Sequence, residues 1–252
     1  MTPSTWLLLA LAGAIGGAVN SVAGGGSFLV FPAILWSGVP AVGANATTAA
    51  ALWPALLASG FAYRRELAAV RSMALTLAAS SAVGGLAGAF LLLRTPDATF
   101  VKVLPFLLAF AALVFSLGPR LTARLGERSG RGALWIAAAL QLAISVYGGY
   151  FGGGMGIMML ATFSIAGMTH LHSMNALKTV LGAIINGLAI AYFFASGAVT
   201  VAAAVPVAVG SVIGGFVGAS AARRLDAKKV RRVVLVYAWA LTAYFFWRSF
   251  GA

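Results

Sequence analysis

The stretch Asn20-Ser-Val-Ala-Gly-Gly-Gly-Ser-Phe-Leu-Val-Phe-Pro32 places three consecutive glycines inside a long apolar run. Glycine has no Cβ and loses the most backbone entropy on ordering, so a triplet interrupts a helix and exposes backbone amides and carbonyls. The stretch Tyr147-Gly-Gly-Tyr-Phe-Gly-Gly-Gly-Met-Gly-Ile-Met-Met159 repeats the pattern later in the chain. Inside a bilayer such a break is tolerated only where protein buries it or where it lines a cavity. Two breaks at matching places in two half-chains therefore indicate a transporter binding site.

The composition is that of a membrane protein. Of the 252 residues, 62% are hydrophobic and only 8% are charged, whereas about a quarter of the residues in a soluble domain are charged. The apolar runs are continuous and do not alternate with period two, which predicts helices rather than a transmembrane barrel. The net charge of +13 comes from basic residues between these runs, so we expect a lipid bilayer and no nucleic acid as partner.

Ten apolar runs divide the chain. They cover about 4–23, 26–36, 43–62, 72–93, 100–118, 132–150, 154–167, 173–196, 199–222 and 232–250. A membrane-spanning helix needs about 20 apolar residues. The runs 26–36 and 154–167 are too short for a straight crossing, and each follows a glycine triplet. We predict an all-α integral membrane protein with about 8–10 membrane segments, in which each short run forms a hairpin with the run before it. The first run lacks a basic region at its start and is predicted to be a mature helix.

The two halves of the chain align with each other. Asn175 follows Asn45 by 130 positions. The same interval pairs Ser81, Gly84, Gly85 and Gly88 with Ser211, Gly214, Gly215 and Gly218. Small residues four apart let membrane helices approach closely, so we expect these glycines at helix contacts. The triplets, which begin at Gly24 and Gly152, are 128 positions apart. We predict a first transmembrane repeat at 1–118, a basic cytoplasmic linker at 119–131 and a second repeat at 132–252.

Basic residues predict the orientation of the loops. The linker 119–131 is strongly basic, as are the segments 64–71 and 223–232, so all three are expected on the cytoplasmic side. The segments 37–44 and 197–200 carry no charge and are expected to face outward. Equivalent loops of the two halves carry opposite bias. We therefore predict inverted topology for the two tandem repeats, as in many secondary transporters.

The chain has few of the acids, cysteines and histidines that cation transport, redox chemistry or metal binding would need. The four carboxylates, Glu66, Asp97, Glu127 and Asp226, all lie in predicted loops or at span ends. Cation carriers usually need an acid within the membrane, so this placement argues against a cation carrier and gives no support to proton coupling. The chain has no cysteine, which excludes thiol relays and thiolate metal sites. The two histidines, His170 and His172, have no acid or thiol nearby, so we expect no metal and no cofactor.

Lys178 is the one charged residue that lies well inside an apolar run, away from its ends. On a helix, Asn175, Lys178, Gly182 and Asn186 are spaced by 3, 4 and 4 residues and share a face. A buried ammonium needs a partner, and an anionic substrate fits that role because no acid is available within the membrane. The alternative is that Lys178 snorkels to the cytoplasmic interface.

The first half offers a similar polar stripe without the lysine. Asn45 and Thr48, with Thr47 beside them, supply amide and hydroxyl donors that suit oxyanions. The alternative is that these groups form hydrogen bonds between helices. Asn20 is a candidate to orient the first triplet or to contact substrate. The pair Gln141 and Ser145 has the same two possibilities in the second half, with bonding between helices favoured.

The glycine triplets are themselves candidate binding elements. They are Gly24, Gly25 and Gly26 in the first half and Gly152, Gly153 and Gly154 in the second. Helices that begin at Ser27 and Met155 would direct free amides and partial positive charge towards a bound anion. The alternative is that the triplets act only as packing or hinge elements.

These residues resemble the TauE/SafE family of membrane transporters, known as sulfite exporters. In the first half the resemblance rests on the quoted stretch 20–32, on Gly43-Ala-Asn-Ala-Thr-Thr48 and on Ala51-Leu-Trp-Pro54. In the second half it rests on Gly149-Tyr-Phe-Gly-Gly-Gly-Met-Gly156, His172-Ser-Met-Asn-Ala-Leu-Lys178 and Asn186-Gly187. Many members of the family look to have an Asp where Asn20 stands and a fourth glycine where Ser27 stands. The first difference removes a possible intramembrane acid.

The resemblance implies a multi-pass permease of the bacterial inner membrane that exports sulfite or organosulfonates. The leading hypothesis is transport by alternating access, with an oxyanion site at the interface of the two repeats. Lys178, Asn175, Asn45, Thr48 and the triplet backbones would hold the anion. The alternatives are a carrier of another small solute or of a cation, and a membrane scaffold or assembly factor without a substrate. The sequence does not decide the oligomeric state, and a homo-oligomer is one alternative.

Overall fold

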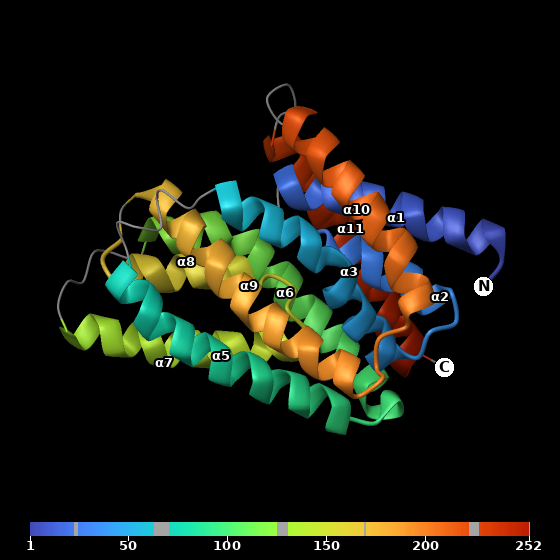
Figure 1. Cartoon of the computed structure of the whole chain (residues 1–252), viewed down its shortest axis with the longest axis horizontal. Helices are drawn as coiled ribbons and strands as arrows, with labels where there is room; N and C mark the ends of the chain where they lie inside the picture. Colours follow the sequence, from blue (N-terminus) through green and yellow to red (C-terminus); the bar gives the residue numbers. More distant parts are fainter. Residues whose placement is uncertain (23–24, 63–70, 125–130, 169, 222–226, 252) are drawn as a thin grey trace. The chain divides into compact units, whose positions relative to one another are not determined.

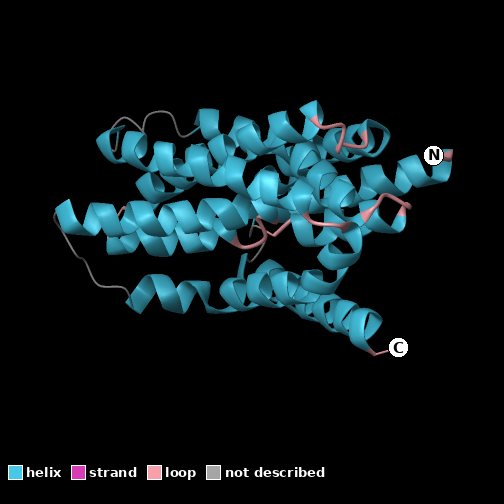
Figure 2. Cartoon of the chain, turned by 90° about the horizontal axis from the view of Figure 1, so that it is seen from below, coloured by secondary structure: helices cyan, strands magenta, loops and turns pink. Residues whose placement is uncertain are grey.

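The computed structural model describes residues 1–22, 25–62, 71–124, 131–168, 170–221 and 227–251. Over these residues the regular structure is entirely α-helical, without a strand (Figure 2). The described helices, labelled as in Figure 1, are α1 (Pro3–Val22), α2 (Ser27–Trp36), α3 (Ala41–Ala62), α5 (Arg71–Arg94), α6 (Asp97–Arg124), α7 (Arg131–Tyr150), α8 (Met155–Ile165), α9 (Leu171–Ala195), α10 (Val201–Ala221) and α11 (Ala227–Phe250). Each of the ten predicted apolar runs forms one of these helices, which confirms the helical prediction.

The two short helices begin where the glycine triplets end. Helix α2 begins at Ser27 and α8 begins at Met155, as predicted. Glycines in the preceding turns adopt positive φ, +87° at Gly25, +81° at Gly152 and +75° at Gly154. An L-residue with a side chain rarely adopts this conformation, so the triplets are the positions at which the chain can leave one helix and enter the next.

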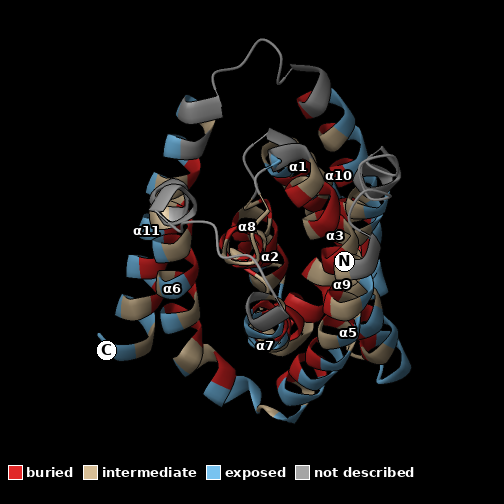
Figure 3. Ribbon diagram, turned by 90° about the vertical axis from the view of Figure 1, so that its left-hand side faces the viewer, coloured by how far each residue is buried: buried red, intermediate tan, exposed pale blue. Residues whose placement is uncertain are grey.

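Six described helices are long and apolar enough to cross a membrane. They are α1, α5, α6, α9, α10 and α11. The described apolar parts of α2, α3, α7 and α8 are shorter. Buried and exposed residues lie on opposite sides of the same helices (Figure 3), and many exposed side chains are large and apolar, such as Phe216, Trp247 and Val233. This surface is what a multi-pass membrane protein presents to lipid, because hydrocarbon offers no penalty for exposed apolar groups.

The described chain forms two compact units. Unit 1 consists of residues 1–55, 93–112 and 193–252, and unit 2 consists of residues 56–92 and 113–192. Each unit therefore combines segments from both predicted repeats.

In unit 1, helix α1 packs along helix α10 at glycines (Figure 1). A Cβ on Gly214 would collide with the backbone of Ala14, and a Cβ on Gly17 would collide with the backbone of Ser211. The two backbones therefore approach within a distance that only glycine permits. Ser211 adds a polar contact, because its Oγ donates to the carbonyl oxygen of Ala51 on α3 at 3.1 Å.

In unit 2, helix α5 packs on helix α7 in the same manner. A Cβ on Gly84 would lie 2.6 Å from the carbonyl oxygen of Leu142, and a Cβ on Gly88 would collide with the carbonyl oxygen of Val146. Gly214 lies 130 positions after Gly84, and Leu142 lies 128 positions after Ala14. Both intervals are those found in the sequence alignment of the halves. The packing role predicted for Gly84, Gly88 and Gly214 is thereby confirmed.

A polar contact accompanies this second helix pair. Gln141 Nε2 on α7 donates to Ser81 Oγ on α5 at 2.9 Å and to Ser145 Oγ at 3.2 Å, and all three residues are fully buried. Of the two interpretations of Gln141 and Ser145, the contacts support hydrogen bonding between helices. Gln141 Oε1 has no hydrogen-bond partner among the described residues.

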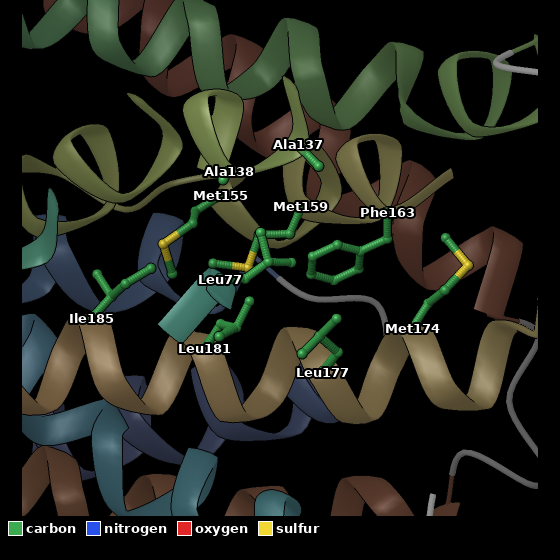
Figure 4. Close-up of a cluster of buried hydrophobic side chains, with 10 residues drawn as sticks. All are labelled: Leu77, Ala137, Ala138, Met155, Met159, Phe163, Met174, Leu177, Leu181 and Ile185. Carbon is green, nitrogen blue, oxygen red and sulfur yellow. The ribbon is translucent and has the colours of Figure 1, made fainter. Parts of the chain in front are cut away.

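The core of unit 2 joins α8 to α9 (Figure 4). From α8, Met155, Met159 and Phe163 point towards α9, at the four-residue spacing that places side chains on one helix face. From α9, Leu177, Leu181 and Ile185 face them. This apolar contact fixes the start of α8 against the middle of α9, where the predicted polar stripe lies.

Candidate functional site

The turn before α8 leaves backbone amides without partners. Phe151 N and Gly152 N both donate to the carbonyl oxygen of Tyr147, and Met155 N reaches the carbonyl oxygen of Gly152 at 3.3 Å. Within the described residues, the amides of Gly153, Gly154 and Gly156 donate no hydrogen bond. Gly154 is the N-cap residue of α8 and has no side chain to cap it. The start of α8 therefore carries several donors and the positive end of the helix dipole.

Tyr147 binds this turn with its side chain as well. Its phenolic hydroxyl donates to the carbonyl oxygen of Gly153 at 2.6 Å. Its ring makes an edge contact with Phe151, with the two centroids 6.3 Å apart. Tyr147 is not among the functional residues that the sequence predicts. The only signal in the sequence is its position five residues before the triplet.

Lys178 lies beside the start of α8. A Cβ built on Gly156 would lie 3.2 Å from Lys178 Cδ and 3.7 Å from Lys178 Cγ, so the alkyl stem of the lysine passes over this glycine. Lys178 Nζ donates to Asn175 Oδ1 at 2.9 Å. Both residues are half-buried. The predicted pair therefore forms, and it lies on the side of α9 that meets the first turn of α8.

The rest of the α9 stripe follows the same edge. A Cβ on Gly182 would lie 3.9 Å from Met155 Cε, so this part of α9 faces the first residue of α8. Asn186 Nδ2 donates to the carbonyl oxygen of Gly182 at 2.8 Å, which fixes the amide against its own helix. Asn175, Lys178, Gly182 and Asn186 thus share a face, as the spacing predicted.

The end of α7, which leads into the turn, packs closely against helices α5 and α9. A Cβ on Gly85 of α5 would lie 2.9 Å from Ile185 Cα on α9, and a Cβ on Gly149 of α7 would collide with the carbonyl oxygen of Gly85. A Cβ on Gly148 would meet Met155 and would lie 3.2 Å from Ile185 Cγ2. Because backbone meets backbone here, the end of α7 that leads into the turn has little freedom to shift.

The equivalent turn in unit 1 is built differently. Gly26 is buried and is the N-cap residue of α2, and a Cβ on it would lie 2.9 Å from Asn20 Cβ. Asn20 itself is exposed near the end of α1. A Cβ on Gly25 would lie 3.2 Å from Val234 Cγ1 on α11. Asn20 therefore packs against the first turn of α2, while Gly24 lies outside the described residues.

The polar stripe of α3 is buried and bonded within unit 1. Thr48 Oγ1 donates to the carbonyl oxygen of Ala44 at 2.7 Å, one turn back on its own helix. Thr47 Oγ1 accepts a hydrogen bond from Thr200 N at 3.0 Å, which ties α3 to the start of α10. Asn45 is 7% exposed. The hydroxyl hydrogen of Thr48 thus has an acceptor on its own helix, and Thr47 serves helix packing.

The two halves of the sequence differ at two aligned positions, and in the second half the residues at these positions are in contact. Lys178 aligns with Thr48 at the interval of 130, and Gly156 aligns with Phe28 at the interval of 128. The first half therefore has a large residue on its short helix and a small one on the following helix, and the second half has the reverse. Because the stem of Lys178 lies over Gly156, the glycine provides the room that the lysine needs.

Asp97, the acid among the described residues, is far from this turn in the sequence and accepts a hydrogen bond from another helix. Asp97 begins α6, and its Oδ1 accepts a hydrogen bond from Val42 N in the first turn of α3 at 2.8 Å. Glu66, Glu127 and Asp226 lie outside the described residues. Among the described residues, the groups at the start of α8 are thus an ammonium, backbone N–H groups and a side-chain amide. Such a set of donors favours an anion over a cation.

Comparisons with known proteins relate the chain to membrane transporters. The profile of the family described as "Sulfite exporter TauE/SafE" matches residues 9–245. The chain is 29% identical over 238 residues to "Probable membrane transporter protein ORF9" of Sinorhizobium sp, with 92% of this chain and 89% of the relative covered. It is 27% identical over 243 residues to a "Probable membrane transporter protein" of Haemophilus influenzae, with 94% of this chain and 92% of the relative covered. It is 25% identical over 245 residues to "Probable membrane transporter protein YfcA" of Escherichia coli K12, with 94% of this chain and 88% of the relative covered. No solved structure matches the chain.

Proposed function

Because the chain belongs to the TauE/SafE family, whose members are membrane transporters and not enzymes, we propose that it exports a small sulfur oxyanion across the bacterial inner membrane. The substrate class is sulfite or an organosulfonate, in which three oxygen atoms surround one sulfur. Three acceptor oxygens match a site that offers several N–H donors from different directions.

The observation that carries this proposal is the position of Lys178 beside the glycine turn. Its stem passes over Gly156, and its ammonium donates to Asn175 on one side. The remaining two ammonium hydrogens, together with the amides of Gly153 and Gly154, then bind the anion. A lysine held within an apolar helix costs free energy unless an opposite charge neutralises it, and a bound oxyanion provides that charge.

The equivalent elements of the first half carry no ammonium. Thr48 occupies the position of the lysine and donates to Ala44. For Asn45 and for the first triplet, a role in anion binding stays a prediction from the sequence. We assign the main electrostatic attraction to the second half, because a full positive charge outweighs amide and hydroxyl dipoles at similar distance.

We further propose that residues 1–118 and 132–252 are two repeats of inverted topology that carry the anion by alternating access. The matching contacts of Gly84 with Leu142 and of Gly214 with Ala14 support the duplication, because both residues of each pair are related by the sequence intervals. The opposite charge bias of equivalent loops supports the inversion.

The test is exchange of radiolabelled sulfite in proteoliposomes that contain wild-type protein, Lys178→Ala or Lys102→Ala. Lys102 is an exposed lysine of α6 and is the matched control. We expect saturable exchange by the wild type and by Lys102→Ala, with a KM about tenfold higher in Lys178→Ala, the loss typical of one hydrogen bond to a charged group. Wild-type protein that exchanges neither sulfite nor sulfate, taurine or chloride would overturn the proposal.

A further inference from the structure

Tyr147 binds the glycine turn at two points. Its backbone carbonyl oxygen accepts hydrogen bonds from Phe151 N at 2.8 Å and from Gly152 N at 3.1 Å. Its hydroxyl donates to the carbonyl oxygen of Gly153 at 2.6 Å. The first contact ends α7, and the second reaches across the turn to the peptide that precedes α8. A tyrosine at this position therefore connects the end of one helix with the start of the next.

The hydroxyl bond fixes the orientation of one peptide group. The described chain has no cis peptide bond, so the carbonyl of Gly153 and the N–H of Gly154 point in opposite directions. When the carbonyl oxygen is held by Tyr147, the N–H of Gly154 must point away from Tyr147. Glycine lies on both sides of this peptide, and Gly154 has a φ of +75°. Rotation of the peptide therefore meets no Cβ, and a single bond to its carbonyl is enough to select one orientation.

The orientation of this peptide decides which charge the turn presents. In the observed orientation the N–H of Gly154 is free to bind a ligand, as are the amides of Gly153 and Gly156 within the described residues. In the flipped orientation a carbonyl oxygen would replace one of these donors. A carbonyl oxygen repels an oxyanion and attracts a cation. The Gly153–Gly154 peptide is thus a point at which anion preference can be gained or lost.

The first half lacks the equivalent hydroxyl. Tyr147 lies 128 positions after Val19, whose side chain cannot donate a hydrogen bond. The same half has Thr48 in place of Lys178. The hydroxyl that orients the peptide and the ammonium that attracts an anion therefore occur together in the second half. This coincidence indicates that the two residues serve one site.

We propose that Tyr147 is a positioning residue that maintains anion preference by holding the Gly153 carbonyl away from the ligand. The inference rests on the proposed function, since it concerns the same anion site. Tyr147 itself does not contact the anion. It acts through the backbone, so its removal weakens binding of the anion without removing the path for transport.

The experiment compares sulfite exchange in proteoliposomes by wild type, Tyr147→Phe and Tyr192→Phe. Tyr192 is a half-buried tyrosine of α9, and its ring contacts Phe90, so it is a control for loss of a phenolic hydroxyl elsewhere in unit 2. We expect the KM of Tyr147→Phe to rise about tenfold while its maximal rate stays within about twofold, as for loss of one amide donor to a charged ligand. Tyr192→Phe should keep both wild-type values. Wild-type KM in Tyr147→Phe would overturn the inference and leave the proposed function intact, whereas absence of exchange by the wild type would overturn the proposed function itself.

Two further substitutions at Tyr147 distinguish loss of the hydroxyl bond from a general loss of folding. Replacement of Tyr147 by 4-aminophenylalanine retains a hydrogen-bond donor at the end of the ring, whereas 4-methylphenylalanine fills the same space without one. We expect the amino analogue to restore the wild-type KM and the methyl analogue to behave like Tyr147→Phe. Equal KM values for the two analogues would contradict a role for the hydroxyl bond, whatever the stability of Tyr147→Phe.

Discussion

The stem of Lys178 lies over Gly156, at the first turn of α8, where a Cβ on the glycine would be 3.2 Å from Lys178 Cδ. In the first half the two aligned positions hold Thr48 and Phe28, and Phe28 is 2% exposed. The large residue is thus on the short helix in one half and on the following helix in the other. This exchange of size places a charged side chain at one glycine turn and not at the other.

Replacement of Gly156 by Phe should therefore displace Lys178. We expect the sulfite KM of Gly156→Phe to rise about tenfold, because the ammonium can no longer keep its position beside the turn. Gly156→Ala is the control, since a methyl group at 3.2 Å from a flexible lysine stem requires only a small adjustment, and its KM should stay within about twofold. Exchange kinetics in proteoliposomes measure both. A wild-type KM in Gly156→Phe would show that the lysine stem does not need this space.

The double variant Gly156→Phe/Lys178→Thr copies both residues of the first half. We expect its unfolding free energy in mixed micelles to exceed that of Gly156→Phe alone, because the shorter threonine leaves room for the ring. Sulfite exchange should stay low because the charge is absent. Purely additive effects of the two substitutions on stability would contradict the size exchange.

The two helix pairs predict a contrast between neighbouring glycines of α10. Gly214→Ala should lower the free energy of unfolding by about 1–3 kcal/mol, the usual cost of overpacking, because its Cβ would collide with the backbone of Ala14. In Gly215→Ala the new Cβ would lie 3.8 Å from the carbonyl oxygen of Gly17, an ordinary contact. Its unfolding free energy should stay within about 0.5 kcal/mol of the wild type. Equal losses in the two variants would argue against close backbone contact between α1 and α10.

Gln141 gives a test of polar packing between α5 and α7. Replacement by Leu removes the bond to Ser81, which in membrane proteins contributes about 0.6 kcal/mol on average. It also removes Oε1, a buried acceptor without a partner among the described residues, and an unsatisfied group of this kind costs about 1–3 kcal/mol. We therefore expect Gln141→Leu to unfold at the wild-type free energy or slightly above it. A loss of more than about 1 kcal/mol would indicate that Oε1 has a partner, such as a buried water.

Asp97 should matter for folding and not for transport. Its carboxylate accepts the N–H of Val42 at the start of α3, so Asp97→Ala should lower the unfolding free energy by about 1 kcal/mol, as for loss of a helix cap. Asp97→Asn retains an acceptor and should lose less. Sulfite exchange by both variants should keep its wild-type dependence on the pH gradient. A changed dependence would instead make Asp97 a proton carrier.

Local signals in the sequence predicted most of the helices. The lengths of the apolar runs and the two glycine triplets were enough to place α2 at Ser27 and α8 at Met155, because glycine acts on the backbone where it stands. The spacing of Asn175, Lys178 and Asn186 likewise predicted a shared face, since the helical period is fixed.

Tertiary contacts could not be predicted in this way. The hydroxyl bond from Tyr147 to Gly153 depends on how the chain turns between α7 and α8, and a tyrosine near a span end is also common for interfacial reasons. The contact of Lys178 with Gly156 depends on the packing of α8 on α9. The pairing of α1 with α10, and of α5 with α7, joins segments from different halves of the sequence. Glycine spacing predicted close packing at these positions but could not identify the partner helix.

The most direct test of the central claim is whether sulfite stabilises the purified protein through Lys178. A ligand that binds only the folded state adds about 2.7 kcal/mol at a concentration about 100 times its Kd. We predict a melting temperature that rises with sulfite for wild type and Lys102→Ala. In Lys178→Ala a tenfold weaker Kd leaves about 1.4 kcal/mol at the same sulfite concentration, so the rise should be about half as large. Varying the concentration of sodium or potassium should produce no rise. An equal rise with sulfite in wild type and Lys178→Ala would contradict an anion site centred on this lysine.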